Sequence, residues 1–191
     1  MDNNINFNRR NFLRALSLGT AHMLFSNPLG AENTLFRNSD PLQKVKLGHS
    51  GLKPTLIGFG TGVHANNRTC FLTKQERQKS ISLLRYGYER GIRFFDCADS
   101  YGTHDLVAEA LAKVDREKVI ISSKIWVLPT GGIPEPERPD ANIVVDRFRK
   151  ELKTDYLDLV QIHCMVDNDW TESQKKQMDI LEKLKQKGII K

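Results

Sequence analysis

From residue 44 onward the sequence alternates between short apolar runs and longer stretches whose apolar residues recur at helical spacing. The runs at 92–95, 119–124 and 156–162 have the length and the content of β-branched and aromatic residues that are typical of strands. Strands that alternate with helices predict right-handed βαβ units around a parallel sheet. We therefore expect an α/β fold with four strand–helix units, followed at residue 188 by the start of another strand.

Several local signals place these elements. Two short strands, 44–47 and 56–60, are expected around a turn. The run Thr73–Glu76 has the spacing of a capping box, which predicts a helix that begins there and ends near Gly91. Apolar residues at helical spacing predict three further helices, over 106–111, 143–152 and 171–187.

Charge and cysteine content exclude some classes of protein. The net charge is +6, but acidic and basic residues are interspersed along the chain, which is typical of a solvated surface rather than of a nucleic-acid-binding face. Cys70, Cys97 and Cys164 are far apart and form no C-x-x-C pair. The sequence therefore predicts neither a metal site nor a disulfide framework, and we expect each thiol to be buried and inaccessible.

The first 31 residues have the order of a twin-arginine signal sequence. Arg9 and Arg10 are followed by Phe12 and Leu13, then by a weakly apolar stretch to Phe25 that is too short and too interrupted to anchor the chain in a membrane. We expect a signal over 1–31, a linker over 32–43 and the folded domain over 44–191. This predicts export to the periplasm. If the segment is instead a basic tail, the protein is cytoplasmic.

Polar residues follow the apolar strands where a parallel sheet would gather them. Asp96, Lys124 and His163 end three consecutive predicted strands, and Tyr101 lies in the loop after Asp96. The carboxyl ends of parallel strands meet on one face, so these four side chains form a plausible acid–base group. A phenol with a pKa of about 10 is a poor proton donor at neutral pH, but a nearby ammonium lowers that pKa. Each residue alone also has a purely structural explanation, as a loop cap or as packing.

At this point the motifs resemble those of the aldo-keto reductase family. The segment Gly91-Ile92-Arg93-Phe94-Phe95-Asp96-Cys97-Ala98-Asp99-Ser100-Tyr101-Gly102 resembles the family signature, with Cys97 in place of a threonine. Ile121–Lys124 resembles the segment that carries the family lysine, and Leu152–His163 is similar to the segment that ends in the family histidine. The turn at 47–52 and Gly58–Thr61 also fit.

The resemblance implies a (β/α)8 TIM barrel, of which about the first four units are present in this chain. It implies that Asp96, Tyr101, Lys124 and His163 are the catalytic tetrad of an oxidoreductase. In it, Tyr101 is the general acid, Lys124 and Asp96 tune it, and His163 orients the carbonyl group. The implied cofactor is NADP, contacted by Gly60, Thr61 and Asp96, and the implied substrates are small aldehydes or ketones.

A complete barrel takes about 250 residues, whereas this chain has 191. We therefore expect either a homodimer, a second polypeptide that supplies the other half, or a chain that is inactive as truncated. The alternative to an enzyme is a non-enzymatic half-barrel that acts as an interaction module, or a gene fragment.

Overall fold

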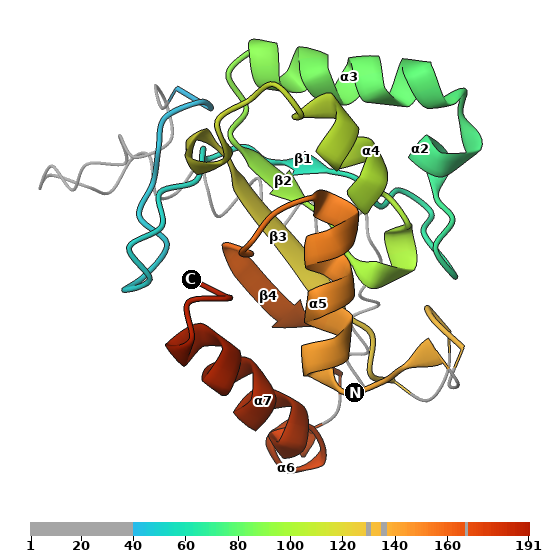
Figure 1. Cartoon of the computed structure of the whole chain (residues 1–191), viewed down its shortest axis with the longest axis vertical. Helices are drawn as coiled ribbons and strands as arrows, with labels where there is room; N and C mark the ends of the chain where they lie inside the picture. The colour runs from blue at the N-terminus through green and yellow to red at the C-terminus, as the bar shows by residue number, and fades with distance from the viewer. Residues whose placement is uncertain (1–39, 129–130, 135–136, 167) are drawn as a thin grey trace, which may run out of the picture. The chain divides into compact units, whose positions relative to one another are not determined.

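The computed structural model describes residues 40–128, 131–134, 137–166 and 168–191 (Figure 1). In this part of the chain, four strands form one sheet in which every neighbouring pair is parallel. The spatial order β1-β2-β3-β4 is the order along the chain. The prediction of an α/β fold with a parallel sheet is confirmed. The strands are β1 (Phe59–Gly60), β2 (Phe94–Asp96), β3 (Ile120–Ile125) and β4 (Leu159–Ile162).

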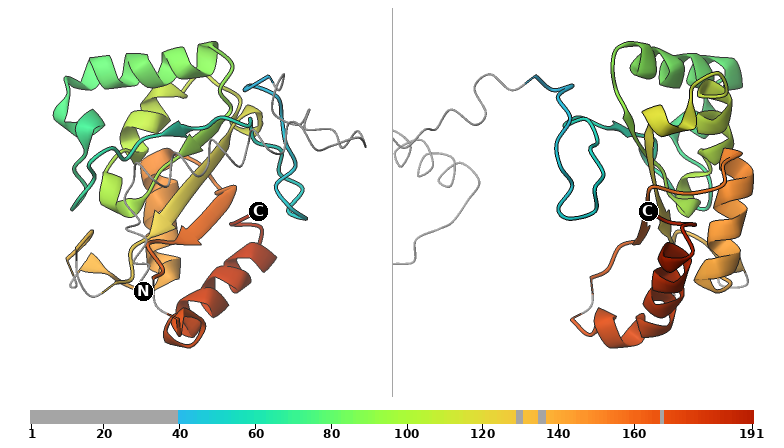
Figure 2. Two further views of the ribbon diagram at one scale, coloured as in Figure 1. Left: turned by 180° about the vertical axis from the view of Figure 1, so that it is seen from behind. Right: turned by 60° about the vertical axis from the view of Figure 1, so that its left-hand side comes forward.

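The helices lie on one side of this sheet, as the right-hand view of Figure 2 shows. Consecutive helices pack against one another, α3 on α4, α4 on α5 and α5 on α7. One-sided cover in chain order is the arrangement that right-handed βαβ units give when a sheet curls into a barrel. The helices are α2 (Phe71–Lys74), α3 (Arg77–Glu89), α4 (His104–Ala110), α5 (Ala141–Leu152), α6 (Trp170–Ser173) and α7 (Lys175–Gln186), with short 3-10 turns η1 (Asp99–Tyr101) and η2 (Arg116–Lys118).

The hydrophobic core lies between the sheet and these helices. Leu84 on α3, Val107 on α4 and Phe148 on α5 are fully buried, as is Phe95 at the centre of β2. In the register of the sheet, Phe95 lies opposite Phe59 on one side and Ile121 on the other. Burial of large apolar side chains is the main stabilising contribution in such a core. The core thereby fixes the directions in which the strand ends point.

A buried carboxylate joins β3 to the segment before β4. Asp158 is 4% exposed, and it accepts a hydrogen bond from the backbone N–H of Ile121 at 2.9 Å. The guanidinium of Arg116 pairs with the same oxygen atom. A buried charge is tolerated when it is paired in this way. The contact helps to set the register in which β3 and β4 meet.

The opening hairpin is less regular than predicted. Residues 44–47 do form antiparallel contacts, with a bridge between Lys44 and Thr55 and hydrogen bonds from Val45 to Pro54 and from Leu47 to Leu52. No extended strand is formed there, and β1 is limited to residues 59–60. Pro54 lacks a backbone N–H, so it cannot take part in a full ladder.

The threonine of the predicted capping box caps a different helix from the one predicted. Thr73 lies inside the short helix α2, and its hydroxyl accepts a hydrogen bond from the backbone N–H of Cys70 at 2.7 Å. The longer helix α3 begins after Glu76, which makes no side-chain cap. Its end is as predicted. Gly91 follows the helix with φ of 103°, a left-handed conformation that glycine adopts without strain.

The predicted final helix is divided at Gln174, which ends α6 and precedes α7. On α7, Leu181 and Leu184 are buried, but Met178 is 42% exposed, so the predicted apolar face is only partly covered. The strand expected from residue 188 is represented by a parallel bridge between Leu157 and Ile190.

The cysteine prediction is wrong for one of the three residues. Cys70 and Cys97 are buried, whereas Cys164 is exposed. It lies in the turn after β4, with φ of 56°, outside the strands and helices that form the core. The predicted signal at 1–31 lies outside the described residues. None of the helices that the structure describes combines the length and the hydrophobicity of a membrane-spanning segment.

Candidate active site

The fold brings the four predicted site residues to one edge of the sheet. Asp96 is the last residue of β2, Lys124 lies one residue before the end of β3, and His163 directly follows β4. Tyr101 closes the 3-10 turn η1 after β2. Because all the strands are parallel, their carboxyl ends converge, as the sequence predicted. The one difference is that β3 extends past Lys124 to Ile125.

Lys124 is the centre of this group. Its ammonium donates to both carboxylate oxygens of Asp96, at 2.6 and 2.7 Å, and to the backbone carbonyl of Cys97 at 3.0 Å. It also lies 3.4 Å from the hydroxyl of Tyr101 and 4.9 Å from the centre of that ring. The lysine side chain is 14% exposed and the aspartate 30%. Charge-assisted hydrogen bonds in such a shielded place are stronger than exposed ones, so the ammonium is fixed beside the phenol.

The ring of Tyr101 packs against a glycine. A Cβ atom added to Gly62 would lie 2.4 Å from the nearest ring atoms, so a side chain at this position would displace the phenol. The neighbouring Gly102 has φ of 65° and approaches the carbonyl of Arg68 so closely that a Cβ would be 2.1 Å from that oxygen. Both glycines therefore permit the tight path of the chain around Tyr101.

His163 completes the group through ring contacts. Its ring lies edge-on to Tyr101, with 5.7 Å between ring centroids, and edge-on to Trp126 at 5.1 Å. The Nδ1 atom is buried and has no hydrogen-bond partner among the described residues. Burial lowers the pKa of His163 below its usual 6.5, as does the charge of Lys124, while Asp96 opposes the shift. The imidazole is therefore neutral at pH 7.

The three residues predicted to contact a cofactor differ in what they present. Gly60 ends β1, and a Cβ added there would meet nothing within 4 Å, so open space lies beside its backbone. Thr61 is 1% exposed, and its hydroxyl donates to the Asp96 carbonyl and contacts Thr103. Thr61 thus joins the ends of β1 and β2. The carboxylate of Asp96 is already paired with the ammonium of Lys124.

Cys97, which takes the place of the expected threonine, does not add chemistry to the site. It is fully buried, and burial raises the pKa of its thiol to about 12. A thiol in this state is a poor nucleophile, because the thiolate is the reactive form. Among the described residues, no group of three or more potential ligands from His, Cys, Asp and Glu could hold a metal ion.

Two residues of the site were not predicted from the sequence. Gly62 supports the ring of Tyr101, and Trp126 packs against His163. The cluster of glycines at 58, 60 and 62 was a signal for close approach in this segment. Nothing in the sequence pattern singled out Trp126.

A second depression lies away from the tetrad. A groove of about 590 Å³ runs between β4 and α7, and its apolar lining includes Val160, Ile162, Trp170 and Met178. None of the four tetrad residues lines it. The tetrad is nevertheless the better candidate for chemistry, because it gathers charged and titratable groups in contact.

Comparison with known proteins is consistent with this geometry. The model of the aldo/keto reductase family matches residues 56–191. A Glycine max protein named Probable aldo-keto reductase 1 is 30% identical over 164 residues, which cover 78% of this chain and 43% of that protein. A methylglyoxal reductase of Escherichia coli is 34% identical over 91 residues, 46% of this chain and 30% of that protein.

Comparison with solved structures also points to the aldo/keto reductase family. An aldo-keto reductase from Bacillus halodurans, in its holo form, superimposes with a TM-score of 0.59 at 25% identity and covers 78% of this chain and 48% of that one. The chain spans less than half the length of these relatives. The family model covers well over half of this sequence, and the neighbours have the (β/α)8 barrel fold of which the parallel sheet described above forms part. The chain belongs to the aldo/keto reductase family.

Proposed function

We propose that this chain carries the proton-donating half of an NADP-dependent oxidoreductase that reduces aldehydes or ketones to alcohols. The observation that carries the proposal is the position of the Lys124 ammonium, between the Asp96 carboxylate and the Tyr101 hydroxyl. Membership of the family supports an oxidoreductase, and the holo form of the Bacillus halodurans relative supports a bound cofactor.

The described residues fit the reacting end of such a cofactor. Open space lies beside the backbone of Gly60, and the side chain of the next residue, Thr61, is buried. The buried, unpartnered Nδ1 of His163 lies at the same edge of the sheet. Gly60, Thr61 and Asp96 would form the floor of the nicotinamide site. When bound, the reduced cofactor supplies a hydride to the carbonyl carbon.

Tyr101 would donate the proton. As negative charge develops on the carbonyl oxygen, the phenol proton moves to that oxygen and leaves a phenolate next to Lys124. The ammonium stabilises this phenolate, and Asp96 keeps the ammonium in place. The product is an alcohol, and the phenolate is reprotonated from solvent.

His163 would orient the substrate. Its lowered pKa keeps the imidazole neutral, so one ring nitrogen carries a hydrogen that it can donate to the carbonyl oxygen. The ring lies beside Tyr101, which places the two donors next to each other. A carbonyl oxygen held by both would be within reach of the proton.

Fluorescence titration of the purified full chain with NADPH tests the proposal, together with its molecular mass in solution. Saturable binding, followed by loss of NADPH when an aldehyde is added, is the expected result. A mass of twice that of one chain would indicate that a homodimer completes the site. A soluble, folded chain that neither binds NADPH nor turns over a carbonyl would contradict the proposal.

One observation favours a second function, a half-barrel interaction module without catalysis. The groove between β4 and α7 has an apolar lining, and exposed Trp170 and Met178 contribute to it. Exposed apolar surface of this kind commonly marks a protein contact. The same titration distinguishes the two functions, because an interaction module would not turn over a carbonyl substrate.

For the location we propose export by the twin-arginine route, with the cytoplasm as the alternative. The proposal is supported by the sequence Arg9-Arg10-Asn11-Phe12-Leu13. Fractionation of cells that produce the full chain, compared with an Arg9→Lys, Arg10→Lys variant, tests it. Equal periplasmic amounts of the two proteins would contradict the proposal.

A further inference from the structure

A network of charged side chains lies behind the tetrad, on the helix side of the sheet. Its first member is Asp99, which lies two residues before Tyr101. The Asp99 side chain is 3% exposed. The carboxylate accepts from Nε of Arg68 at 3.0 Å and from the guanidinium of Arg147 at 2.7 Å. A carboxylate this deeply buried with two cationic partners is a costly arrangement unless every contact is kept.

The two arginines come from different elements of the fold. Arg68 belongs to the loop after β1, which also contains Gly62, the residue beneath the phenol ring. Its backbone has φ of 56°, and its carbonyl touches Gly102. Arg147 belongs to α5. Asp99 therefore connects η1 both to the loop that supports the ring and to a helix of the barrel wall.

The network of charged and polar side chains continues from Arg147 to β3. Arg147 also donates to Glu151 at 3.1 Å, and the other oxygen of Glu151 lies 2.7 Å from Nδ1 of His104. Nε2 of His104 is 2.8 Å from the hydroxyl of Ser123. His104 is 3% exposed and Ser123 is fully buried. Burial alone would raise the pKa of Glu151, but the contacts with His104 and Arg147 lower it overall, as expected for a paired carboxylate.

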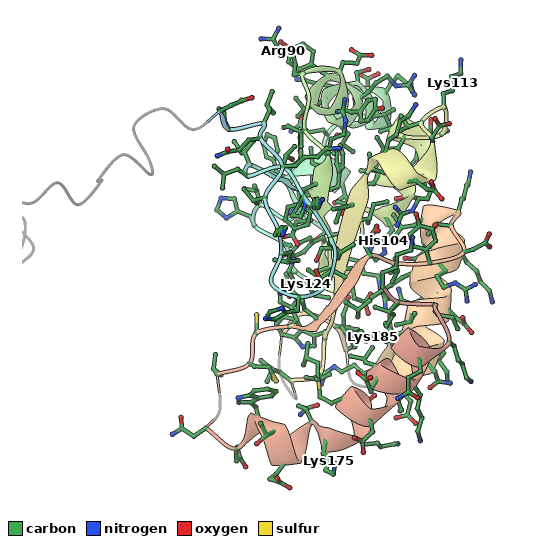
Figure 3. The ribbon with its side chains drawn as sticks, turned by 90° about the vertical axis from the view of Figure 1, so that its left-hand side faces the viewer. Arg90, His104, Lys113, Lys124, Lys175 and Lys185 are labelled. Atoms are coloured by element: carbon green, nitrogen blue, oxygen red, sulfur yellow. The ribbon has the colours of Figure 1, made fainter. Side chains whose placement is uncertain are left out.

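The last contact is next to the tetrad. Ser123 and Lys124 are consecutive in β3, and successive side chains of a strand point to opposite faces. Ser123 points toward α4 and Lys124 toward the face away from the helices. Figure 3 labels Lys124 and His104 on these two sides of β3. The network thus begins beside Tyr101, the proposed proton donor, and ends beside Lys124, whose ammonium contacts the Tyr101 hydroxyl.

We propose that Asp99, held by Arg68 and Arg147, is a positioning residue for Tyr101, and that the Glu151–His104–Ser123 branch couples that position to the strand carrying Lys124. None of these residues touches the proposed reacting atoms. Their effect is on geometry, because a misplacement of about 1 Å at a catalytic group can cost about a hundredfold in rate. The inference rests on the proposed role of Tyr101 as proton donor.

The test uses the full chain with Asp99→Asn. This change keeps the size of the side chain and removes the charge that pairs with both guanidinium groups, which retain Glu137 and Glu151 as their other partners. The control is Asp105→Asn, because Asp105 lies on the next helix and pairs with Arg77 in an exposed ion pair. The two variants remove the same charge from places that differ in burial and in contact with the tetrad.

One readout does not depend on activity. The ring of His163 touches Tyr101, so its imidazole resonances and titration midpoint, assigned by NMR with a His163→Asn variant, report on the position of the phenol. We expect Asp99→Asn to shift both and Asp105→Asn to leave both at the wild-type values. If Asp99→Asn fails to fold, Arg147→Lys replaces it, since it keeps the charge but loses the forked contact with Asp99 and Glu151.

The second readout is turnover. We expect kcat for carbonyl reduction to fall about tenfold or more in Asp99→Asn, with the Kd for NADPH changed by less than about twofold. A folded Asp99→Asn chain with the wild-type His163 signals and kcat would overturn the inference. If the wild-type chain reduces no carbonyl, the proposed function fails, but the His163 signals still decide whether Asp99 positions Tyr101.

Discussion

Lys124 and His163 lie at the ends of neighbouring strands, yet they are held in different ways. The ammonium of Lys124 has four oxygen atoms within hydrogen-bond distance. The imidazole of His163 is held by ring contacts, and its Nδ1 has no partner among the described residues. The comparison indicates that the proton-donating side of the site is fixed by hydrogen bonds inside this chain. On the carbonyl-orienting side, the buried Nδ1 makes no hydrogen bond to the described residues, so the imidazole is positioned by packing alone.

The largest effect is expected at the hydrogen-bonded side. Lys124→Met removes the ammonium and leaves the Asp96 carboxylate without its partner. Loss of this assistance to proton transfer should lower kcat by about 10² to 10⁴-fold, with a much smaller change in the Kd for NADPH. Steady-state kinetics and NADPH titration measure the two quantities. An equal loss in kcat and in NADPH affinity would mean that Lys124 binds the cofactor rather than assisting the donor.

Displacement of the phenol without loss of any polar group should have a smaller effect. Gly62→Ala places a Cβ against the Tyr101 ring, and we expect kcat to fall by about a hundredfold. The matched control is the same change in a Tyr101→Ala background, where the clash is absent. In thermal unfolding, Gly62→Ala should destabilise the wild-type background more than the Tyr101→Ala background. Equal destabilisation in the two backgrounds would contradict the contact.

The register between β3 and β4, the strands that carry the two sides of the site, can be tested through Asp158. Asp158→Asn weakens the pair with Arg116 and the hydrogen bond from Ile121 that join β3 to the β4 segment. We expect a loss of about 2 kcal/mol in the free energy of unfolding, from hydrogen bonds to a charged group. Denaturant unfolding measures it, and Asp155→Asn, at an exposed site that has no ion pair among the described residues, serves as the comparison. A loss equal to that of Asp155→Asn would contradict the account.

The smallest expected effect is on the pH dependence of the free energy of unfolding. The pKa of His163 is lowered on folding, so below its unfolded value of about 6.5 the unfolded chain binds more protons than the native one. The free energy of unfolding should therefore fall as pH decreases from about 6.5 through the lowered pKa of the native state. Thermal unfolding of the wild type and of His163→Asn across this range measures the difference. If the variant shows the same pH dependence as the wild type, His163 is not the responsible group.

The parallel sheet and the tetrad positions were predictable because both depend on local signals. Short apolar runs indicated the strands, and Asp96, Lys124 and His163 follow or end them in the sequence itself. The roles of these residues remain predictions from the family resemblance. The sheet confirms only that the fold brings them together.

Other features could not be predicted, because they depend on contacts between distant segments. Thr73 caps α2 rather than α3 because its partner is Cys70. Cys164 is exposed because it lies in the turn after β4, outside the core. The pairing of Asp99 with Arg68 and Arg147 joins residues 31 and 48 positions apart, and no periodicity in the sequence encodes it.

Tyr101→Phe is the sharpest test of whether Tyr101 is the proton donor of a site assembled by this chain. This change removes the hydroxyl and keeps the ring against Gly62 and beside His163. NADPH binding and carbonyl turnover by the full chain are measured side by side. We expect unchanged NADPH binding and a loss of kcat of about 10² to 10⁴-fold. Turnover by Tyr101→Phe equal to that of the wild type would contradict it.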